Sequence, residues 1–239
     1  IWFDGWWDHD EDTIPFNWQL PEQYAMIHKL QPACIIGNNH HQTPFEGEDM
    51  QMFERAIPGE NKNGLSGQSI SRLPLETCQT MNGMWGYKIK DQNYKSTKEL
   101  IRLLVRTAAK GANLLLNIGP QPNGELPATA LDRLADMGKW LNGNAGESIY
   151  RTVAGEVALG DSIVSTCGKG KKAPLYIHIL TDKKDGEIAV TMKGKAKKAT
   201  NLITGDKLAF RKDKATGKTI FELNDRKGDE DDYIIKVEF

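Results

Sequence analysis

The 239-residue sequence is short of cysteine, of excess charge of one sign and of long apolar runs. Three cysteines, Cys34, Cys78 and Cys167, are too few and too scattered for a disulfide scaffold or a zinc site, so we expect each to fill space in a core. A net charge of −1 argues against a polybasic nucleic-acid-binding protein. No apolar run approaches the roughly 18 residues that span a bilayer, which predicts no membrane span.

The sequence also lacks the features of a natural start. It begins IWFDGWW, without an initiator methionine, a basic leader or an apolar signal stretch. We therefore expect the chain to be the later part of a longer polypeptide.

Charge is distributed unevenly along the chain. Residues 1–150 hold 13 Lys and Arg against 18 Asp and Glu, whereas residues 151–239 hold 18 against 14. This change of sign predicts two domains with a boundary near residue 150.

The first part alternates short apolar runs with helical patterns. Strands are expected in IWFDGWW, ACIIGNN, PLETCQTM and ANLLLNIGP. Helices are expected in residues 21–32, between Ser96 and Gly111, and after NIGP, the last with Pro127 in its first turn and Gly143 as its stop. Ser96 and Glu99 predict a capping box, and Gly111 predicts a helix stop. Repeated strand–helix units with apolar strands predict α/β architecture, namely the second half of a (β/α)8 TIM-like barrel.

After residue 150 the pattern changes to short β-rich runs separated by Gly, Asp, Asn and Lys. The runs are SIVSTCG, PLYIHIL, EIAVTMK, ATNLI, KLAFR, TIFELN and YIIKVEF. Seven short strands with turn signals about every ten residues predict an antiparallel β-sandwich over residues 151–239. The lysine-rich turns between them are typical of solvated loops.

Asp4 stands among aromatic residues at an expected strand end. Trp2, Phe3, Trp6 and Trp7 surround it, and burying an unpaired carboxylate would be costly. In a (β/α)8 barrel the C-terminal ends of strands face the active site. Aromatic faces beside carboxylates suit a sugar, although a core or loop-plug role for these rings is equally compatible with composition.

Five segments in order carry a family resemblance: WFDGWW, GEDMQMFERAIPGEN, PLETCQTMNGMWGY, GANLLLNIGPQPNGELP and LDRLADMGKWLNGNAGESIYRT. Together they resemble glycoside hydrolase family 29, the α-L-fucosidases, over roughly residues 1–152. The resemblance implies a retaining mechanism with Asp4 as the nucleophile. We expect no cofactor and no metal. It also implies a C-terminal β-sandwich.

The acid/base residue has two candidates. Glu54 lies in a stretch that resembles the variable loop where several family members hold their acid/base residue, whereas Glu76 lies in PLETC at an expected strand end. We favour Glu54, because apolar burial beside Phe53 can keep a loop carboxyl protonated. The alternative for Glu76 is a structural acid that orients other groups.

Four residues are candidates for binding substrate: Trp2, His40, His41 and Trp85. Trp2 resembles the family position that lines the fucose pocket, and NNHH replaces an arginine that many members use to bind sugar hydroxyls. Trp85 is equally compatible with a packing role. A zinc site at His40 and His41 is disfavoured, because neighbouring residues rarely ligate one ion.

The predicted function is hydrolysis of terminal α-L-fucose from fucosylated glycans or oligosaccharides. The alternative is a catalytically silent relative that binds fucosylated glycan. Expected partners are the glycan and the missing N-terminal half of the barrel, with no nucleic acid. The resemblance implies a periplasmic, secreted or lysosome-like location.

Overall fold

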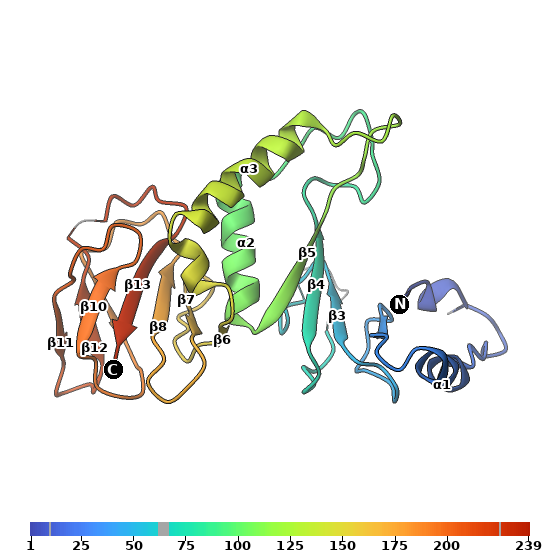
Figure 1. Ribbon diagram of the computed structural model, residues 1–239, viewed down its shortest axis with the longest axis horizontal. Helices are drawn as coiled ribbons and strands as arrows, with labels where there is room; N and C mark the ends of the chain where they lie inside the picture. Colours follow the sequence, from blue (N-terminus) through green and yellow to red (C-terminus); the bar gives the residue numbers. More distant parts are fainter. Residues whose placement is uncertain (10, 62–66, 225) are drawn as a thin grey trace. The chain divides into compact units, whose positions relative to one another are not determined.

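The computed structural model describes residues 1–9, 11–61, 67–224 and 226–239 (Figure 1). The chain forms two compact units. The first contains Ile1–Thr80 and Ala112–Asn117, and the second contains Met81–Gly111 and Ile118–Phe239. The domain boundary near residue 150 stays a prediction, because these units group segments by packing and not by sequence order.

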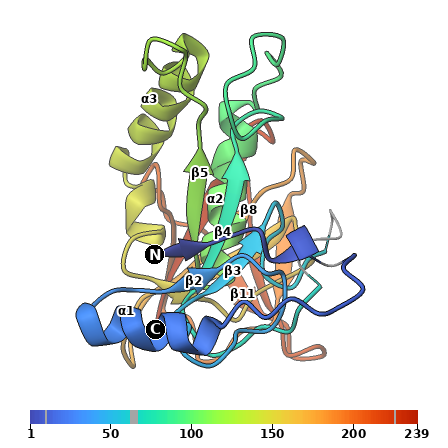
Figure 2. The ribbon, with the colours of Figure 1, turned by 90° about the vertical axis from the view of Figure 1, so that its right-hand side faces the viewer.

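Short parallel strands form the framework of the first unit. They are β1 (Trp2–Phe3), β2 (Gly37–Asn38), β3 (Gln51–Glu54), β4 (Leu75–Thr80) and β5 (Ala112–Asn117). β1 pairs with β2, and β3, β4 and β5 form a second sheet in that order (Figure 2). A hydrogen bond from Asp49 N to Ile36 O (2.8 Å) joins the segments that precede β3 and β2. The predicted parallel pairing is therefore found among these strands, although β3 is a strand that the sequence did not predict.

Two expectations about the glutamates are wrong. Glu54 does not lie in a loop but is the last residue of β3. Its strand is only QMFE, which is too short and too polar at its ends to give a clear strand pattern. Glu76 is the second residue of β4 and so lies near the amino end of that strand, not at the carboxyl end.

One helix covers the pair β1 and β2. Helix α1 (Leu20–Leu30) matches the predicted helix and buries Leu20 and Tyr24. The Tyr24 ring meets the Phe3 ring edge-on, with centroids 5.2 Å apart. A short 3-10 helix, η1 (Trp6–His9), follows β1. Phe3 therefore faces helix α1. Because successive side chains of a strand point to opposite faces, Trp2 and Asp4 lie on the other face of β1.

Helix α2 (Thr97–Ala109) of the second unit begins after Ser96, as the sequence predicts, whereas Pro127 is the N-cap of α3 (Ala128–Asn142) and not part of its first turn. In α2, Ser96 Oγ accepts from Glu99 N and Glu99 Oε2 accepts from Ser96 N, so the capping box is confirmed. Gly111, at φ 73°, ends the segment in the left-handed region, where glycine carries no Cβ penalty. Helix α3 (Ala128–Asn142) and the 3-10 helix η2 (Ala145–Ser148) follow.

The remaining strands form two antiparallel sheets. They are β6 (Val153–Ala154), β7 (Ile163–Cys167), β8 (Leu175–Ile179), β9 (Glu187–Val190), β10 (Lys198–Asn201), β11 (Phe210–Lys212), β12 (Thr219–Glu222) and β13 (Tyr233–Glu238). One sheet has the order β10-β13-β8-β7-β6 and the other β11-β12-β9. All seven predicted strand runs are found, and β6 is an eighth strand that the pattern did not indicate.

A continuous apolar core joins the two antiparallel sheets. Ile177 and Ile235 from the larger sheet and Val190 and Phe221 from the smaller one are fully buried in the same cluster. Alternate residues of each strand supply this core, as expected for face-to-face sheets. None of the helices in the described ranges is long and apolar enough to cross a membrane.

Candidate active site

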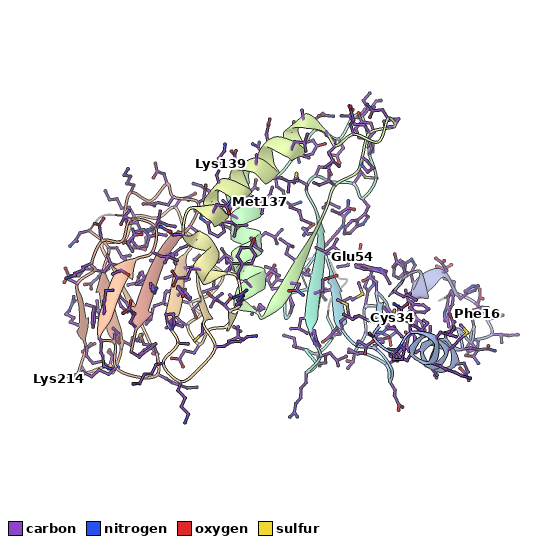
Figure 3. The ribbon with its side chains drawn as sticks, in the orientation of Figure 1. Phe16, Cys34, Glu54, Met137, Lys139 and Lys214 are labelled. Carbon is purple, nitrogen blue, oxygen red and sulfur yellow. The ribbon has the colours of Figure 1, made fainter. Side chains whose placement is uncertain are left out.

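The candidate site lies at the carboxyl ends of β1, β2 and β3. Asp4 directly follows β1, Asn39 directly follows β2, and Glu54 is the last residue of β3. Parallel strands bring their carboxyl ends to the same edge of a sheet, which explains why residues so distant in sequence meet. Figure 3 labels Glu54 at this edge.

One amide group connects the two carboxylates. Asn39 Nδ2 donates to Glu54 Oε2 (2.8 Å) and to Asp4 Oδ1 (3.2 Å). Asn39 is buried, and its Oδ1 has no hydrogen-bond partner among the described residues. Two acceptors facing one amide require the NH2 end to point toward them, so the orientation of the Asn39 amide follows from its neighbours.

His41 approaches Glu54 from a second direction. Its Nε2 donates to the same oxygen, Glu54 Oε2, at 3.2 Å, and the two side chains are 20% and 14% exposed. The Trp7 indole stacks on the imidazole, with centroids 5.0 Å apart and an interplanar angle of 6°. The Glu54 carboxylate is therefore fixed by two donors while it stays accessible to solvent.

The backbone at this edge is strained. His41, at φ 59°, and Arg55, at φ 52°, both occupy the left-handed region, which non-glycine residues seldom adopt. Arg55 directly follows Glu54, and His41 is two residues after Asn39. Such conformations cost on the order of 1–3 kcal/mol each and gather at functional sites.

Cys78 shows that three carboxylates converge. It pairs with Glu54 in the β3–β4 register and so points to the same face of the sheet. Burial first, and then the negative charges of Glu54, Glu76 and Asp4, raise the pKa of the Cys78 thiol to about 12. The thiol therefore stays protonated and serves as apolar packing beneath the carboxylates.

Glu76 points to the same face of the sheet as Cys78 and Glu54 but lies two residues nearer the amino ends of the strands. Its partner across β3 is Met52, two residues before Glu54, so it lies closer to the amino ends of the strands. Burial raises the pKa of its carboxyl above the ordinary glutamate value. Among the described residues, Asn39 donates a hydrogen bond to Glu54 and to Asp4 but not to Glu76.

His40 belongs to a separate buried network. Its Nε2 donates to Glu48 Oε1 (3.0 Å), and these side chains are only 2% and 1% exposed. The Tyr24 hydroxyl donates to the same Glu48 oxygen, and Asn38 Nδ2 donates to the Tyr24 hydroxyl. This network lies on the α1 face of β1 and β2, away from the carboxylates.

The other predicted residues divide between the two units. Trp2 is exposed and shares the Asp4 face of β1, whereas Trp85 belongs to the second unit, so its contact with a sugar stays a prediction. Sequence reasoning missed Asn39, Trp7 and Cys78 as members of the site. The pair NN after the apolar run ACII was the available signal for Asn39. In the part of the chain that the structure describes, no group of three or more His, Cys, Asp or Glu is arranged to hold a metal ion.

Comparisons with known proteins identify the family of the chain. The profile of the alpha-L-fucosidase family matches residues 1–146. The plasma alpha-L-fucosidase of Homo sapiens is 41% identical over 186 residues, which cover 63% of this chain and 40% of that protein. The alpha-L-fucosidase of Branchiostoma floridae is 38% identical over 166 residues, which cover 64% of this chain and 32% of that protein.

Solved structures of alpha-L-fucosidases have the same fold as this chain. Alpha-L-fucosidase isoenzyme 1 from Paenibacillus thiaminolyticus superimposes with a TM-score of 0.75 at 29% identity, over 95% of this chain and 55% of that one. A GH29 alpha-L-fucosidase from Bacteroides thetaiotaomicron, trapped as a covalent intermediate with 2-fluoro-fucosyl fluoride, has the same fold at a TM-score of 0.78 and 23% identity, over 99% of this chain and 55% of that one. The chain thus spans less than half of these curated relatives and about half of these solved ones. It belongs to the alpha-L-fucosidase family of glycoside hydrolases, GH29.

Proposed function

We propose that the complete protein is a retaining exo-α-L-fucosidase that hydrolyses terminal α-L-fucose from glycans through a covalent glycosyl-enzyme intermediate. Asp4 is the nucleophile and Glu54 the acid/base residue. The observation that carries the proposal is the Asn39 amide shared by the two carboxylates.

The shared amide limits the separation of the two carboxylates. Since Asn39 Nδ2 lies 3.2 Å from Asp4 Oδ1 and 2.8 Å from Glu54 Oε2, these oxygens are at most 6.0 Å apart, the sum of the two distances. Retaining glycosidases hold their carboxyl groups about 5–5.5 Å apart, whereas inverting enzymes need roughly 6.5–9.5 Å to admit a water. The limit supports a direct attack by one carboxylate.

The surroundings of each carboxylate support its role. Asp4 is exposed, accepts one hydrogen bond from Asn39 and lies beside the exposed Trp2, which offers a ring face to a sugar. Glu54 is less exposed and is held by Asn39 and His41, which suits a group that must exchange a proton with the leaving oxygen. His41 and Trp2 are the proposed sugar contacts, and Glu76 shapes the charge of the site without reacting.

The architecture is part of the proposal. β1 to β5 are the later strands of a (β/α)8 barrel, and further chain supplies the other strands with their share of the fucose pocket. The sequential parallel order of β1–β2 and of β3–β4–β5 supports this, as does the 55% coverage of the Paenibacillus relative. The sandwich contributes no catalytic group.

Two variants of the complete protein test the proposal. With an activated aryl α-L-fucoside, Asp4→Ala should lose roughly 10³-fold or more in kcat, and azide should restore turnover to give β-fucosyl azide. Glu54→Ala should be crippled toward a natural linkage but much less toward the activated substrate, and azide should give the α-fucosyl azide.

Glu76→Ala is the matched control, because it removes a carboxylate from the same face of the sheet. It should slow both substrates alike and give no azide product. If Glu76→Ala shows the leaving-group contrast and Glu54→Ala does not, the acid/base assignment reverses. If all three variants keep near wild-type activity, the roles proposed for Asp4 and Glu54 are wrong. If the wild type binds fucosylated glycan without hydrolysing it, the protein is a silent glycan-binding relative.

A further inference from the structure

The topology of the sandwich brings three lysine-rich segments to one end. The turn 168–174 joins the end of β7 to the start of β8, and Cys167 and Leu175 pair directly. The segment 191–197 leads from β9 into β10, whose first residue, Lys198, pairs with Glu238 near the end of β13. The turn 213–218 closes the hairpin of β11 and β12, where Lys212 pairs with Thr219.

Contacts with Glu156 and the strand register show that the three segments share this end. Lys193 N donates to Glu156 Oε1, and Lys193 Nζ lies 3.7 Å from Glu156 Oε2. Burial and the charge of the same Glu156 raise the pKa of Cys167, the last residue before the turn 168–174. The β9–β12 register pairs Val190 with Thr219, which brings the turn 213–218 to the point where the segment 191–197 begins. Figure 3 labels Lys214 in that hairpin turn.

We call this surface the lysine end. It consists of exposed lysines and few acids. The lysines are Lys169, Lys171, Lys172, Lys193, Lys195, Lys197, Lys198, Lys212, Lys214 and Lys218. The nearby acids are Glu156, Asp213 and Glu238, and of the ten lysines only Lys193 and Lys198 form ion pairs among the described residues.

The opposite end of the sandwich is rich in acidic residues. The segments 180–186, 202–209 and 226–232 lie there, because Tyr233 pairs with Ile179 and Asn201 pairs with Ile235. The acids of these segments are Asp182, Asp185, Asp206, Asp229, Glu230, Asp231 and Asp232. A chain with a net charge of only −1 thus carries a strongly basic surface, which a count over the whole sequence conceals.

The composition of the lysine end indicates the kind of partner. The segments 168–174, 191–198 and 212–218 contain no arginine, the residue that favours bidentate recognition of phosphate, and no aromatic residue on which a nucleobase could stack. The lysine ammonium groups lie mainly in the segments that connect several strands, and neighbouring strands are about 4.8 Å apart. Separate positive charges distributed in this way match negative groups that repeat along a flexible polymer.

We propose that the lysine end binds an anionic, sulfated polysaccharide and thereby holds the protein on its glycan. The choice of a polysaccharide rests on the proposed function, and the charge complementarity rests on the sandwich alone. The surface carries no catalytic group, so binding there raises the local concentration of substrate without changing the chemical step.

The test compares two charge-matched variants of the complete protein. One replaces Lys169, Lys171, Lys195 and Lys214 with glutamine at the lysine end, and the control replaces Lys183, Lys184, Lys207 and Lys227 with glutamine at the opposite end. Isothermal titration with dextran sulfate should give a Kd that rises about 10-fold or more for the first variant and little for the control. Raising the salt concentration should weaken wild-type binding, and uncharged dextran should not bind.

Three outcomes would overturn the proposal: equal losses in the two variants, equal binding of dextran and dextran sulfate, or binding of duplex DNA as tight as that of dextran sulfate at the same salt. Circular dichroism checks that both variants are folded. Hydrolysis of a small aryl fucoside separates this proposal from the proposed function, because both variants should keep wild-type turnover. If turnover is absent from the wild type while the Kd difference persists, the fucosidase proposal fails and the binding surface stands.

Discussion

Two histidine–carboxylate pairs, one in each unit, differ in almost everything except their chemistry. His41 and Glu54 are 3.2 Å apart and partly exposed, and Asn39 and Trp7 contact them. His178 Nδ1 and Asp232 Oδ2 are 2.6 Å apart and 0% exposed. Thr166 Oγ1 donates to Ser148 O and also lies 3.3 Å from His178 Nε2, so both ring nitrogens of His178 have hydrogen-bond partners.

The difference separates a pair that contains the proposed acid/base residue from a structural pair. The His178–Asp232 pair is fully buried and cannot contact a substrate. Its role is to hold β8 and the segment before β13 together, and the contact of His178 with Thr166 includes β7. A pair that solvent can reach contributes less to stability, and its orientation is available for chemistry. Removing a member of each pair should therefore affect different measurements.

The largest expected effect is on the stability of the sandwich. Asp232→Ala leaves His178 without its acceptor in a fully buried position, which should lower the free energy of unfolding by about 3–5 kcal/mol. Urea denaturation followed by fluorescence measures it. The exposed Asp229, in the same loop, is the control, and Asp229→Ala should change little. An unchanged midpoint for Asp232→Ala would show that the pair is not a structural element.

The second effect is on activity. Asn39→Ala should lower kcat/KM by roughly 10–100-fold, the usual effect of losing a group that orients a reacting residue. We also expect the bell-shaped pH–rate profile to move to higher pH, because an amide donor stabilises the ionised form of a carboxylate.

Asn38→Ala is the control for this variant. Asn38 precedes Asn39 but donates to the Tyr24 hydroxyl on the α1 face, so its loss should reduce stability and leave the pH–rate profile in place. A purely structural role of Asn39 would be indicated if both variants lowered kcat without moving the profile.

The smallest effect concerns Glu76. Burial raises the pKa of its carboxyl above the ordinary value of 4.5, so its ionised form is disfavoured in the folded state. The stability that this group contributes is fully present below the unfolded-state pKa and is lost as pH rises through the raised folded-state pKa. Glu76→Gln should therefore gain stability over the wild type as pH rises above about 4.5, and denaturation midpoints at several pH values measure the difference. An equal difference at all pH values would contradict this.

Much of the fold could be predicted because its signals are local. The capping box at Ser96, the left-handed Gly111 and the seven sandwich runs depend on neighbours within a few residues. β3 could not be predicted in this way, since QMFE becomes a strand only through its pairing with β4. The placement of Glu54 was wrong for the same reason.

The site was predictable only in part. The motif singles out Asp4 as the candidate nucleophile, but neither motif nor periodicity distinguishes His40 from His41. The structure separates them because His41, at φ 59°, turns toward Glu54, while His40 stays against Glu48. The role of Asn39 depends on contacts 35 and 15 residues away along the chain, which no local pattern contains.

The position of Cys78 has a consequence for redox chemistry. With a pKa of about 12, only about one thiol in 10⁵ is ionised at neutral pH, and thiolate is the form that oxidants and electrophiles attack. Burial first, and then the charge of the surrounding carboxylates, therefore protect the thiol. A cysteine beneath the candidate active site is thus compatible with an oxidising environment, because burial and these charges keep it chemically silent.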